Sequence, residues 1–192
     1  MYCDNYKEIY KYYELVADSF KNKGLRILKT DTHNESLIWD ADSIPLAPIL
    51  QQGNDLTLIE IDADTLQKAK NNFPHVNMHV GDVLTWQGEY DWVLDFSTID
   101  HVEEYCKVLE NYKKMAPNLS LVVWMSTSRS CLKLSDTQFY FPVAEFKKNL
   151  KLVYQHIEEV YLYGEINGKN DLILCHFKAG EAMKNNNNIS WR

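Results

Sequence analysis

The sequence predicts an α/β fold: a Rossmann-like, doubly wound, seven-stranded sheet that is mostly parallel and ends in an antiparallel hairpin. The first observation is the alternation of short β-rich segments with helical segments, which is typical of a doubly wound parallel sheet. The second is that Trp92–Leu94 and Leu121–Trp124 are unbroken apolar runs, as expected of strands buried on both faces. The third is the pair Asn167-Gly168, a turn signal that favours a hairpin between the last two β-rich segments.

Five parallel strands are expected first, followed by the hairpin. In chain order the seven expected strands are Leu25–Thr30, Leu56–Ile61, Val76–Val80, Trp92–Phe96, Leu119–Met125, Glu159–Tyr163 and Leu172–Phe177. Helices fall between them. One is expected over Thr65–Asn72, capped by Asp64 and closed by Phe73-Pro74, because proline cannot continue the backbone ladder. Another is expected within Val102–Met115, whose apolar side chains recur every three or four residues.

A partly aromatic stripe at helical spacing lies before the first expected strand, in Asn5–Phe20. Two interpretations stay open for this helix: it packs against the edge of the sheet, or it forms a lid over a substrate pocket. With 192 residues and 45% hydrophobic content, the chain is expected to form one domain over residues 1–180, with the N-terminal helix or lid in 1–22. Residues 181–192 contain the run Asn185–Asn188 and are expected to be a disordered tail.

The composition bears on location and partners. No apolar stretch approaches the roughly 20 residues that a membrane span needs, and the N-terminus has no apolar signal core, so a cytoplasmic protein without membrane contact is expected. The four cysteines show no CxxC spacing, which argues against a zinc site or a disulfide framework. A net charge of -7 makes nucleic acid an unlikely partner. A small-molecule partner and a monomer or homodimer are expected.

Three further strand ends carry chemically informative residues. Leu58–Asp62 is an apolar run that ends in carboxylates, and the next expected strand ends in Val80-Gly81-Asp82-Val83. Tyr90–Val102 matches the segment type "FDLVLSNLVLHHL" position for position, and its last part is similar to the ending "STLDHF" of a bacterial subgroup. Together these segments resemble the class I S-adenosylmethionine-dependent methyltransferases, and the resemblance spans Leu25–Phe177.

The resemblance implies roles for these residues. Glu60 resembles the acid that accepts hydrogen bonds from both ribose hydroxyls of the cofactor, with Ile61 beside it. The adenine would meet the Asp82 side chain and the next backbone amide. The residues expected to contact the cofactor at these strand ends are Glu60, Ile61, Gly81, Asp82, Val83, Asp95, Ser97 and Thr98.

The resemblance also implies that Asp100 and His101 lie beside the methyl acceptor. His101 could take a proton from an acceptor at neutral pH, and Asp100 could orient the ring or balance its charge. Adjacent residues on a helix do not face one another, so a direct pair between the two is not assumed. The alternative is that Asp100 caps the following helix and His101 is a packed residue of its first turn.

The first expected strand runs into Ile27–Glu35, where the family usually has "VLDLGCGTG". The three glycine positions are Asp31, His33 and Glu35 in this chain, and the segment resembles a variant first motif of the same subgroup, "LKTD" followed by an acid. Asp31 or Glu35 could pair with the ammonium of the cofactor, and Lys29 or the Thr30 hydroxyl with its carboxylate. A metal site at Asp31, His33 and Glu35 is disfavoured, because these ligands would need a fully extended loop.

Two later segments complete the sequence prediction. Met115–Leu119 resembles the "LKPGG" turn of the family, with Asn118 in place of a glycine. The polar segment that begins at Ser126–Ser130 and runs to Phe139–Pro142 is interpreted either as an acceptor-binding loop, in which Arg129 suits a carboxylate or phosphate, or as a surface connection. The expected function is S-adenosylmethionine-dependent O- or N-methylation of a small molecule. The alternatives are a non-catalytic binding protein and an enzyme that acts on S-adenosylmethionine itself.

Overall fold

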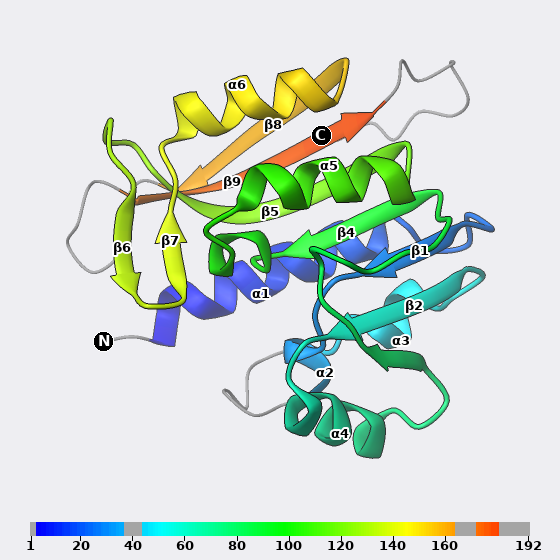
Figure 1. Cartoon of the computed structure of the whole chain (residues 1–192). Helices are drawn as coiled ribbons and strands as arrows, with labels where there is room; N and C mark the ends of the chain where they lie inside the picture. The colour runs from blue at the N-terminus through cyan, green and yellow to red at the C-terminus, as the bar shows by residue number, and fades with distance from the viewer. Residues whose placement is uncertain (1–2, 37–43, 164–171, 181–192) are drawn as a thin grey trace.

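The computed structural model, which describes residues 3–36, 44–163 and 172–180, has a seven-stranded sheet in the order β3-β2-β1-β4-β5-β9-β8 (Figure 1). The pairs between β1 and β2, β2 and β3, β1 and β4, and β4 and β5 are parallel, and β9 is antiparallel to both β5 and β8. The predicted fold class is therefore confirmed. The strands are β1 (Arg26–Lys29), β2 (Asp55–Glu60), β3 (Asn77–Val80), β4 (Trp92–Phe96), β5 (Asn118–Ser126), β8 (His156–Tyr163) and β9 (Leu172–Gly180).

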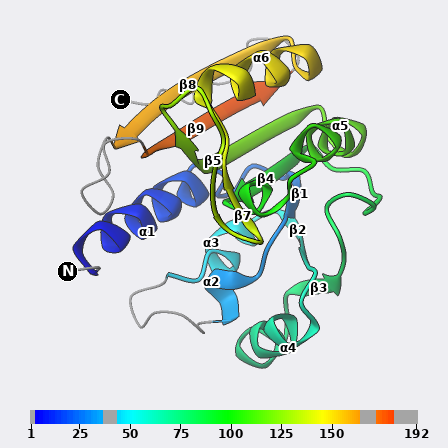
Figure 2. The same ribbon diagram turned by 60° about the vertical axis from the view of Figure 1, so that its left-hand side comes forward.

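Helices cover both faces of this sheet, as the apolar strands require. Helices α5 and α6 lie on one face, and α1 and α3 lie on the other (Figure 2). All five residues of β4 are buried between these layers. The helices are α1 (Cys3–Asp18), α2 (His33–Ser36), α3 (Ala47–Leu50), α4 (Ala63–Asn72), the 3-10 helix η1 (Ile99–His101), α5 (Tyr105–Met115) and α6 (Val143–Val153).

Each face of the sheet has its own hydrophobic core. On one face Tyr112 of α5 and Phe146 of α6 are fully buried against the sheet. On the other, Val16 of α1 and Leu46, which precedes α3, are fully buried. Helix α1 thus packs against a face of the sheet, which agrees with the first of the two interpretations of the N-terminal stripe. None of the helices in the described part of the chain combines the length and apolar character that a membrane span requires.

Two local predictions need correction. Asp62, not Asp64, caps α4: Asp62 has an extended backbone and its Oδ1 accepts a hydrogen bond of 2.6 Å from Thr65 N, whereas Asp64 already lies inside the helix. The polar segment after β5 is not a plain loop, because it forms an antiparallel hairpin of β6 (Leu132–Ser135) and β7 (Gln138–Tyr140). The predicted Asn167-Gly168 turn and the tail 181–192 lie outside the described residues.

The strand order reverses between β1 and β4, which makes the carboxyl ends of these strands a topological switch point. In open α/β sheets, ligands bind in the crevice at such a point. The end of β2 lies next to that of β1, and η1 follows β4 directly. Helix α2 and the β6–β7 hairpin also lie at this edge of the sheet (Figure 1). The site described below is built from these segments.

Candidate functional site

Lys29 ends β1 as a completely buried cation. Its Nζ donates hydrogen bonds to the Asp31 carbonyl oxygen (2.8 Å), to Asp31 Oδ1 (2.9 Å) and to Glu35 Oε2 (3.0 Å). Burial by itself lowers the pKa of Lys29, but the Asp31 and Glu35 carboxylates outweigh this and raise it above its ordinary value. A lysine ammonium has three hydrogens, and all three are used inside the loop. Lys29 therefore has no hydrogen left for a cofactor carboxylate, contrary to the expectation from the sequence.

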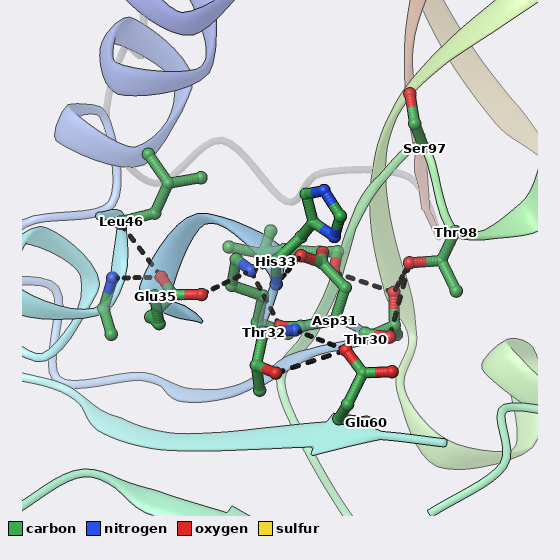
Figure 3. Close-up of polar contacts among 12 residues, drawn as sticks. Thr30, Asp31, Thr32, His33, Glu35, Leu46, Glu60, Ser97 and Thr98 are labelled. Carbon is green, nitrogen blue, oxygen red and sulfur yellow. Dashed lines mark hydrogen bonds and ion pairs between the residues drawn. The ribbon is translucent and has the colours of Figure 1, made fainter. Parts of the chain in front are cut away.

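Glu35 is the acid that faces Lys29 from α2 (Figure 3). Its Oε1 accepts hydrogen bonds of 2.9 Å from Leu46 N and from Ala47 N at the start of α3, and its side chain has no exposed surface. The short helix α2 turns Glu35 inward, which the extended loop considered from the sequence does not allow. Both oxygens of Glu35 are thus engaged within the protein, so the expectation that Glu35 pairs with a cofactor ammonium is not supported by this geometry.

Asp31 is the remaining acid of the loop. Its Oδ1 accepts hydrogen bonds from Lys29 Nζ and from His33 N, the latter at 3.0 Å. Its Oδ2 is buried and has no hydrogen-bond partner among the described residues. Buried polar atoms are nearly always partnered, so a free carboxylate oxygen at the end of β1 is suited to a ligand that donates hydrogen bonds. Of the acids considered for the ammonium, Asp31 is the one with a free oxygen.

Glu60 ends β2 beside this loop. Its Oε2 accepts hydrogen bonds from Thr32 N (3.1 Å) and Thr32 Oγ1 (3.2 Å), and its Oε1 accepts one from Asp62 N (3.1 Å) (Figure 3). The carboxylate therefore holds the β1 loop against β2. A carboxylate offers about four acceptor positions, so the partly exposed Glu60 can still accept a hydrogen bond from a ligand hydroxyl.

Two exposed apolar side chains flank Glu60. Ile61 follows it and is 68% exposed, and Val80 at the end of the neighbouring β3 is 57% exposed. Apolar side chains of this size are rarely so exposed without reason when they gather at a strand edge, and they offer a flat apolar ligand two contacts.

The Gly81-Asp82-Val83 segment forms a tight turn. A Cβ on Gly81 would lie 2.6 Å from Cε3 of Trp86, so the close packing of this ring requires glycine. Asp82 Oδ1 accepts a hydrogen bond of 2.8 Å from Leu84 N, and the Val83 side chain is buried. Asp82 therefore stabilises the turn, and Val83 can meet a ligand only through its backbone.

The end of β4 is locked to the end of β1. Thr30 Oγ1 donates to Thr98 Oγ1 at 3.1 Å, and Thr98 Oγ1 lies 3.3 Å from the Thr30 carbonyl oxygen (Figure 3). Ser97 has a φ of 63°, an uncommon left-handed conformation for a residue with a Cβ, and its Oγ lies 3.1 Å from the Tyr13 hydroxyl of α1. Such outliers cluster at functional sites. Helix α1 thus also contributes a side chain to this edge.

Asp95 is a fully buried acid beneath that turn. Its Oδ1 accepts a 2.7 Å hydrogen bond from Thr98 N, and its Oδ2 accepts one of 2.7 Å from the Tyr112 hydroxyl. Burial raises the pKa of Asp95 from 3.8 to about 7, because the loss of hydration and the charge of Asp31 outweigh these two hydrogen bonds. Asp95 is therefore a positioning residue that shapes the turn from below.

Asp100 and His101 lie together on η1. His101 Nδ1 lies 2.7 Å from the Thr137 carbonyl oxygen of the β6–β7 hairpin, and its Nε2 lies 4.0 Å from Asp100 Oδ1. A carbonyl oxygen only accepts, so Nδ1 carries the hydrogen, and Nε2 of the neutral ring keeps its lone pair. The His101 side chain is 50% exposed and Asp100 is fully buried. The 3-10 turn thus brings these neighbours close, although the distance exceeds that of a hydrogen bond.

Sequence reasoning did not assign Thr32, Tyr13 or Tyr112 to the site. Tyr13 and Tyr112 lie on helical apolar stripes, where a core role is the ordinary expectation, and only the strand ends beneath them show where their hydroxyls reach. No group of three or more metal-ligating side chains occurs within the described ranges, and the sequence predicted no metal.

The fold is shared with solved structures that carry methyltransferase ligands. The N-terminal domain of EvdMO1 with SAH (S-adenosylhomocysteine) bound has a TM-score of 0.66 and 17% identity, over 90% of this chain and 81% of that one. An O-methyltransferase from a trans-AT PKS multienzyme of Brevibacillus brevis, in complex with S-adenosyl-L-homocysteine, has a TM-score of 0.65 and 11% identity, over 88% and 72%. Magnesium protoporphyrin IX methyltransferase from Synechocystis PCC 6803, with bound SAM, has a TM-score of 0.62 and 16% identity, over 90% and 79%.

This chain has the fold of S-adenosylmethionine-dependent methyltransferases. Comparison with models of protein families and with curated protein sequences gives no match. At identities of 11% to 17% the likeness describes the arrangement of the sheet and helices. What the site of this chain does has to be argued from its own residues.

Proposed function

We propose that this protein binds S-adenosylmethionine at the carboxyl edge of its sheet and transfers the methyl group to a small-molecule acceptor. The observation that carries the proposal is the arrangement at the end of β2: the partly exposed Glu60 carboxylate lies between the cofactor loop of the fold and the exposed Ile61 and Val80 side chains. The structures with this fold that are solved with SAH or SAM support the choice of ligand.

The adenosine part of the cofactor would lie between β2 and β3. Glu60 has an acceptor position left for a ribose hydroxyl, and a charge-assisted hydrogen bond of this kind is stronger than a neutral one. Ile61 and Val80 would contact the adenine ring, and the backbone of Val83 would face its edge. Asp82 would act by holding the turn, since its Oδ1 is bonded to Leu84 N.

The methionine part would lie over the β1 loop and the end of β4. Asp31 Oδ2 is buried and unpartnered in the described part of the chain, so it fits the ammonium group of the cofactor. Ser97 and Thr98 would border the same space from β4. Lys29 and Glu35 would fix the loop from beneath, and glycine is not needed where buried side chains define the backbone path.

Transfer of the methyl group depends mainly on positioning. S-adenosylmethionine supplies an electrophilic methyl group on a sulfonium, and the protein has to hold a nucleophilic oxygen or nitrogen in line with it. The lone pair on His101 Nε2 is placed to take the proton that the acceptor loses. Asp100 Oδ1, 4.0 Å from Nε2, would stabilise the imidazolium that results.

Titration calorimetry with S-adenosylmethionine and with S-adenosylhomocysteine tests the proposal. We expect both to bind, and Glu60→Ala to weaken both by roughly 1.5–3 kcal/mol, the range for a hydrogen bond to a charged group. Thr32→Val is the matched control, because it removes one internal bond to Glu60 and leaves the carboxylate in place. If neither ligand binds to the folded wild type, the proposal is wrong.

A second function is favoured by the closed β1 loop. The buried contacts of Lys29 with Asp31 and Glu35 would suit a protein that binds the ligand without transferring the methyl group. Incubation with methyl-labelled S-adenosylmethionine and a pool of small metabolites separates the two functions. Label in an acceptor indicates methyl transfer, and binding without labelled acceptor indicates a binding protein. Loss of S-adenosylmethionine without any acceptor would indicate a reaction on the cofactor itself.

A further inference from the structure

Asp100 is a buried carboxyl group without a hydrogen-bond partner. Its side chain has no exposed surface, and neither Oδ1 nor Oδ2 is hydrogen-bonded within the part of the chain that the structure describes. Leaving a buried polar group unpartnered costs about 1–3 kcal/mol, and more for a charged group. A folded protein tolerates such a cost chiefly where a ligand removes it, so the two free oxygens indicate a binding role for Asp100.

The charges around Asp100 indicate the kind of ligand. Asp95 is close enough to raise the pKa of Asp100, together with burial, well above its ordinary value. The pKa of the Tyr13 phenol, which is raised mainly by burial, is raised further by both Asp100 and Asp31. The buried cation nearby is Lys29, whose three hydrogens are already bonded to Asp31 and Glu35. This part of the edge therefore has more acid than internal cation to balance it.

We infer that Asp100 binds a compact organic cation at the methyl-transfer side of the site. The inference rests on the proposed function, which supplies two sources of such a cation: the sulfonium of S-adenosylmethionine, or the ammonium of an amine acceptor. In either case Asp100 releases one proton to water as the cation arrives, and the carboxylate then pairs with the ligand. The net charge of the buried site rises by no more than the ligand contributes, less the proton released.

The cation would reach Asp100 by way of His101. The His101 ring is half exposed, lies 4.0 Å from Asp100 Oδ1, and is held by its hydrogen bond to the Thr137 carbonyl oxygen. Movement of this one side chain would open Asp100 Oδ1 toward the carboxyl edge. The same ring carries the free lone pair on Nε2, so a cation that enters here lies beside the proposed base. An acceptor ammonium would lose a proton to Nε2 before its nitrogen attacks the methyl carbon.

The cofactor and its product differ in charge at sulfur, which gives the first test. S-adenosylmethionine carries a sulfonium and S-adenosylhomocysteine a neutral thioether, so calorimetry with both ligands on wild type and Asp100→Asn isolates the contribution of that charge. If Asp100 binds the sulfonium, Asp100→Asn weakens S-adenosylmethionine by about tenfold or more and leaves S-adenosylhomocysteine within about twofold. Asp55→Asn is the matched control, because it removes the same charge from an exposed position at the opposite end of β2.

The second arm tests the acceptor ammonium, with methylammonium chloride as the probe and potassium chloride at equal concentration as the salt control. If Asp100 binds an acceptor amine, methylammonium raises the melting temperature of the wild-type complex with S-adenosylhomocysteine, and Asp100→Asn abolishes the difference. Proton release gives a readout on the wild type alone, in case the variant does not fold. Calorimetry in two buffers of different ionisation enthalpy should show release of about one proton with the ligand that binds Asp100.

The inference is overturned if Asp100→Asn binds S-adenosylmethionine like the wild type and methylammonium acts only as a salt. It is also overturned if neither S-adenosylmethionine nor methylammonium releases a proton on binding to the wild type. Failure of the proposed function looks different, since neither S-adenosylmethionine nor S-adenosylhomocysteine would then bind to the wild type. In that case the methylammonium arm, repeated on the protein without S-adenosylhomocysteine, still decides whether Asp100 binds a cation.

Discussion

Lys29 Nζ lies 3.0 Å from Glu35 Oε2, and neither side chain has any exposed surface. This ion pair takes the place of the glycine-rich loop that the family usually has after the first strand. Glycines let the backbone itself approach a ligand, whereas here two long side chains fill the space under the loop. The Lys29–Glu35 pair therefore fixes the path of the backbone from Asp31 to Ser36, and Asp31 is left at its upper side to meet a ligand.

Separation of this pair should strongly destabilise the protein. Lys29→Met leaves Glu35 and Asp31 as buried charges with their cation removed, and the expected loss is about 3–5 kcal/mol of unfolding free energy. Glu35→Gln leaves Lys29 with one partner fewer. The double variant should lose less than the sum of the two single losses, because it removes both charges of the pair. Urea unfolding measures all three, and additive losses would show that the two side chains are not coupled.

The sequence predicted the sheet well and the loop poorly, for physical reasons. Apolar runs such as Trp92–Leu94 can be buried on both faces only inside a parallel sheet, so the strand order follows from local pattern and general topology. The partners of Glu35 depend on α2, a helix of four residues with no amphipathic pattern to reveal it. The hairpin of β6 and β7 was missed because Lys133, Ser135 and Gln138 make its strands look like a polar loop.

His101 should exist, when neutral, as the tautomer with hydrogen on Nδ1, because Nδ1 lies 2.7 Å from the Thr137 carbonyl oxygen. Nitrogen-15 NMR of the imidazole ring checks this directly. His101→Ala should then lower the rate of methyl transfer by about 10²–10⁴-fold, the usual contribution of a general base, with cofactor affinity nearly unchanged. His156→Ala, at an exposed position on β8, is the control. A ring with hydrogen on Nε2 would remove His101 from the role of base.

Asp95 should make the protein less stable as pH rises through weakly acidic values. Its pKa is about 7 in the folded protein and its ordinary value is 3.8, so between these limits the folded state binds a proton that the unfolded chain has lost. Stability from this group is fully present below about pH 4 and is lost as pH rises through 7. Asp95→Asn keeps an acceptor for Thr98 N and removes the titration. Urea unfolding at several pH values should show stability rising more steeply with pH than in the wild type.

A second buried titrating group lies far from the cofactor edge, between α1 and the sheet. His176 Nδ1 lies 2.7 Å from the Tyr12 hydroxyl and its Nε2 lies 2.9 Å from Ser120 Oγ. Burial lowers the pKa of His176 from 6.5 to about 4, and the charge of Lys178 lowers it further in the same direction. The neutral ring thus joins α1 to β5 and β9. Its position inside an apolar strand gave no local signal of this role.

Replacement of His176 by glutamine should have the opposite effect to Asp95→Asn. Between pH 6.5 and 4 the unfolded chain binds a proton at His176 that the folded protein excludes, so this group's contribution to stability is lost as pH falls. Glutamine can still hydrogen-bond to Tyr12 and Ser120 but does not titrate. His176→Gln should therefore lose less stability on acidification than the wild type, whereas Asp95→Asn should lose more. The exposed His75→Gln is the control, and a His176→Gln curve parallel to that of the wild type would refute the buried neutral state of this ring.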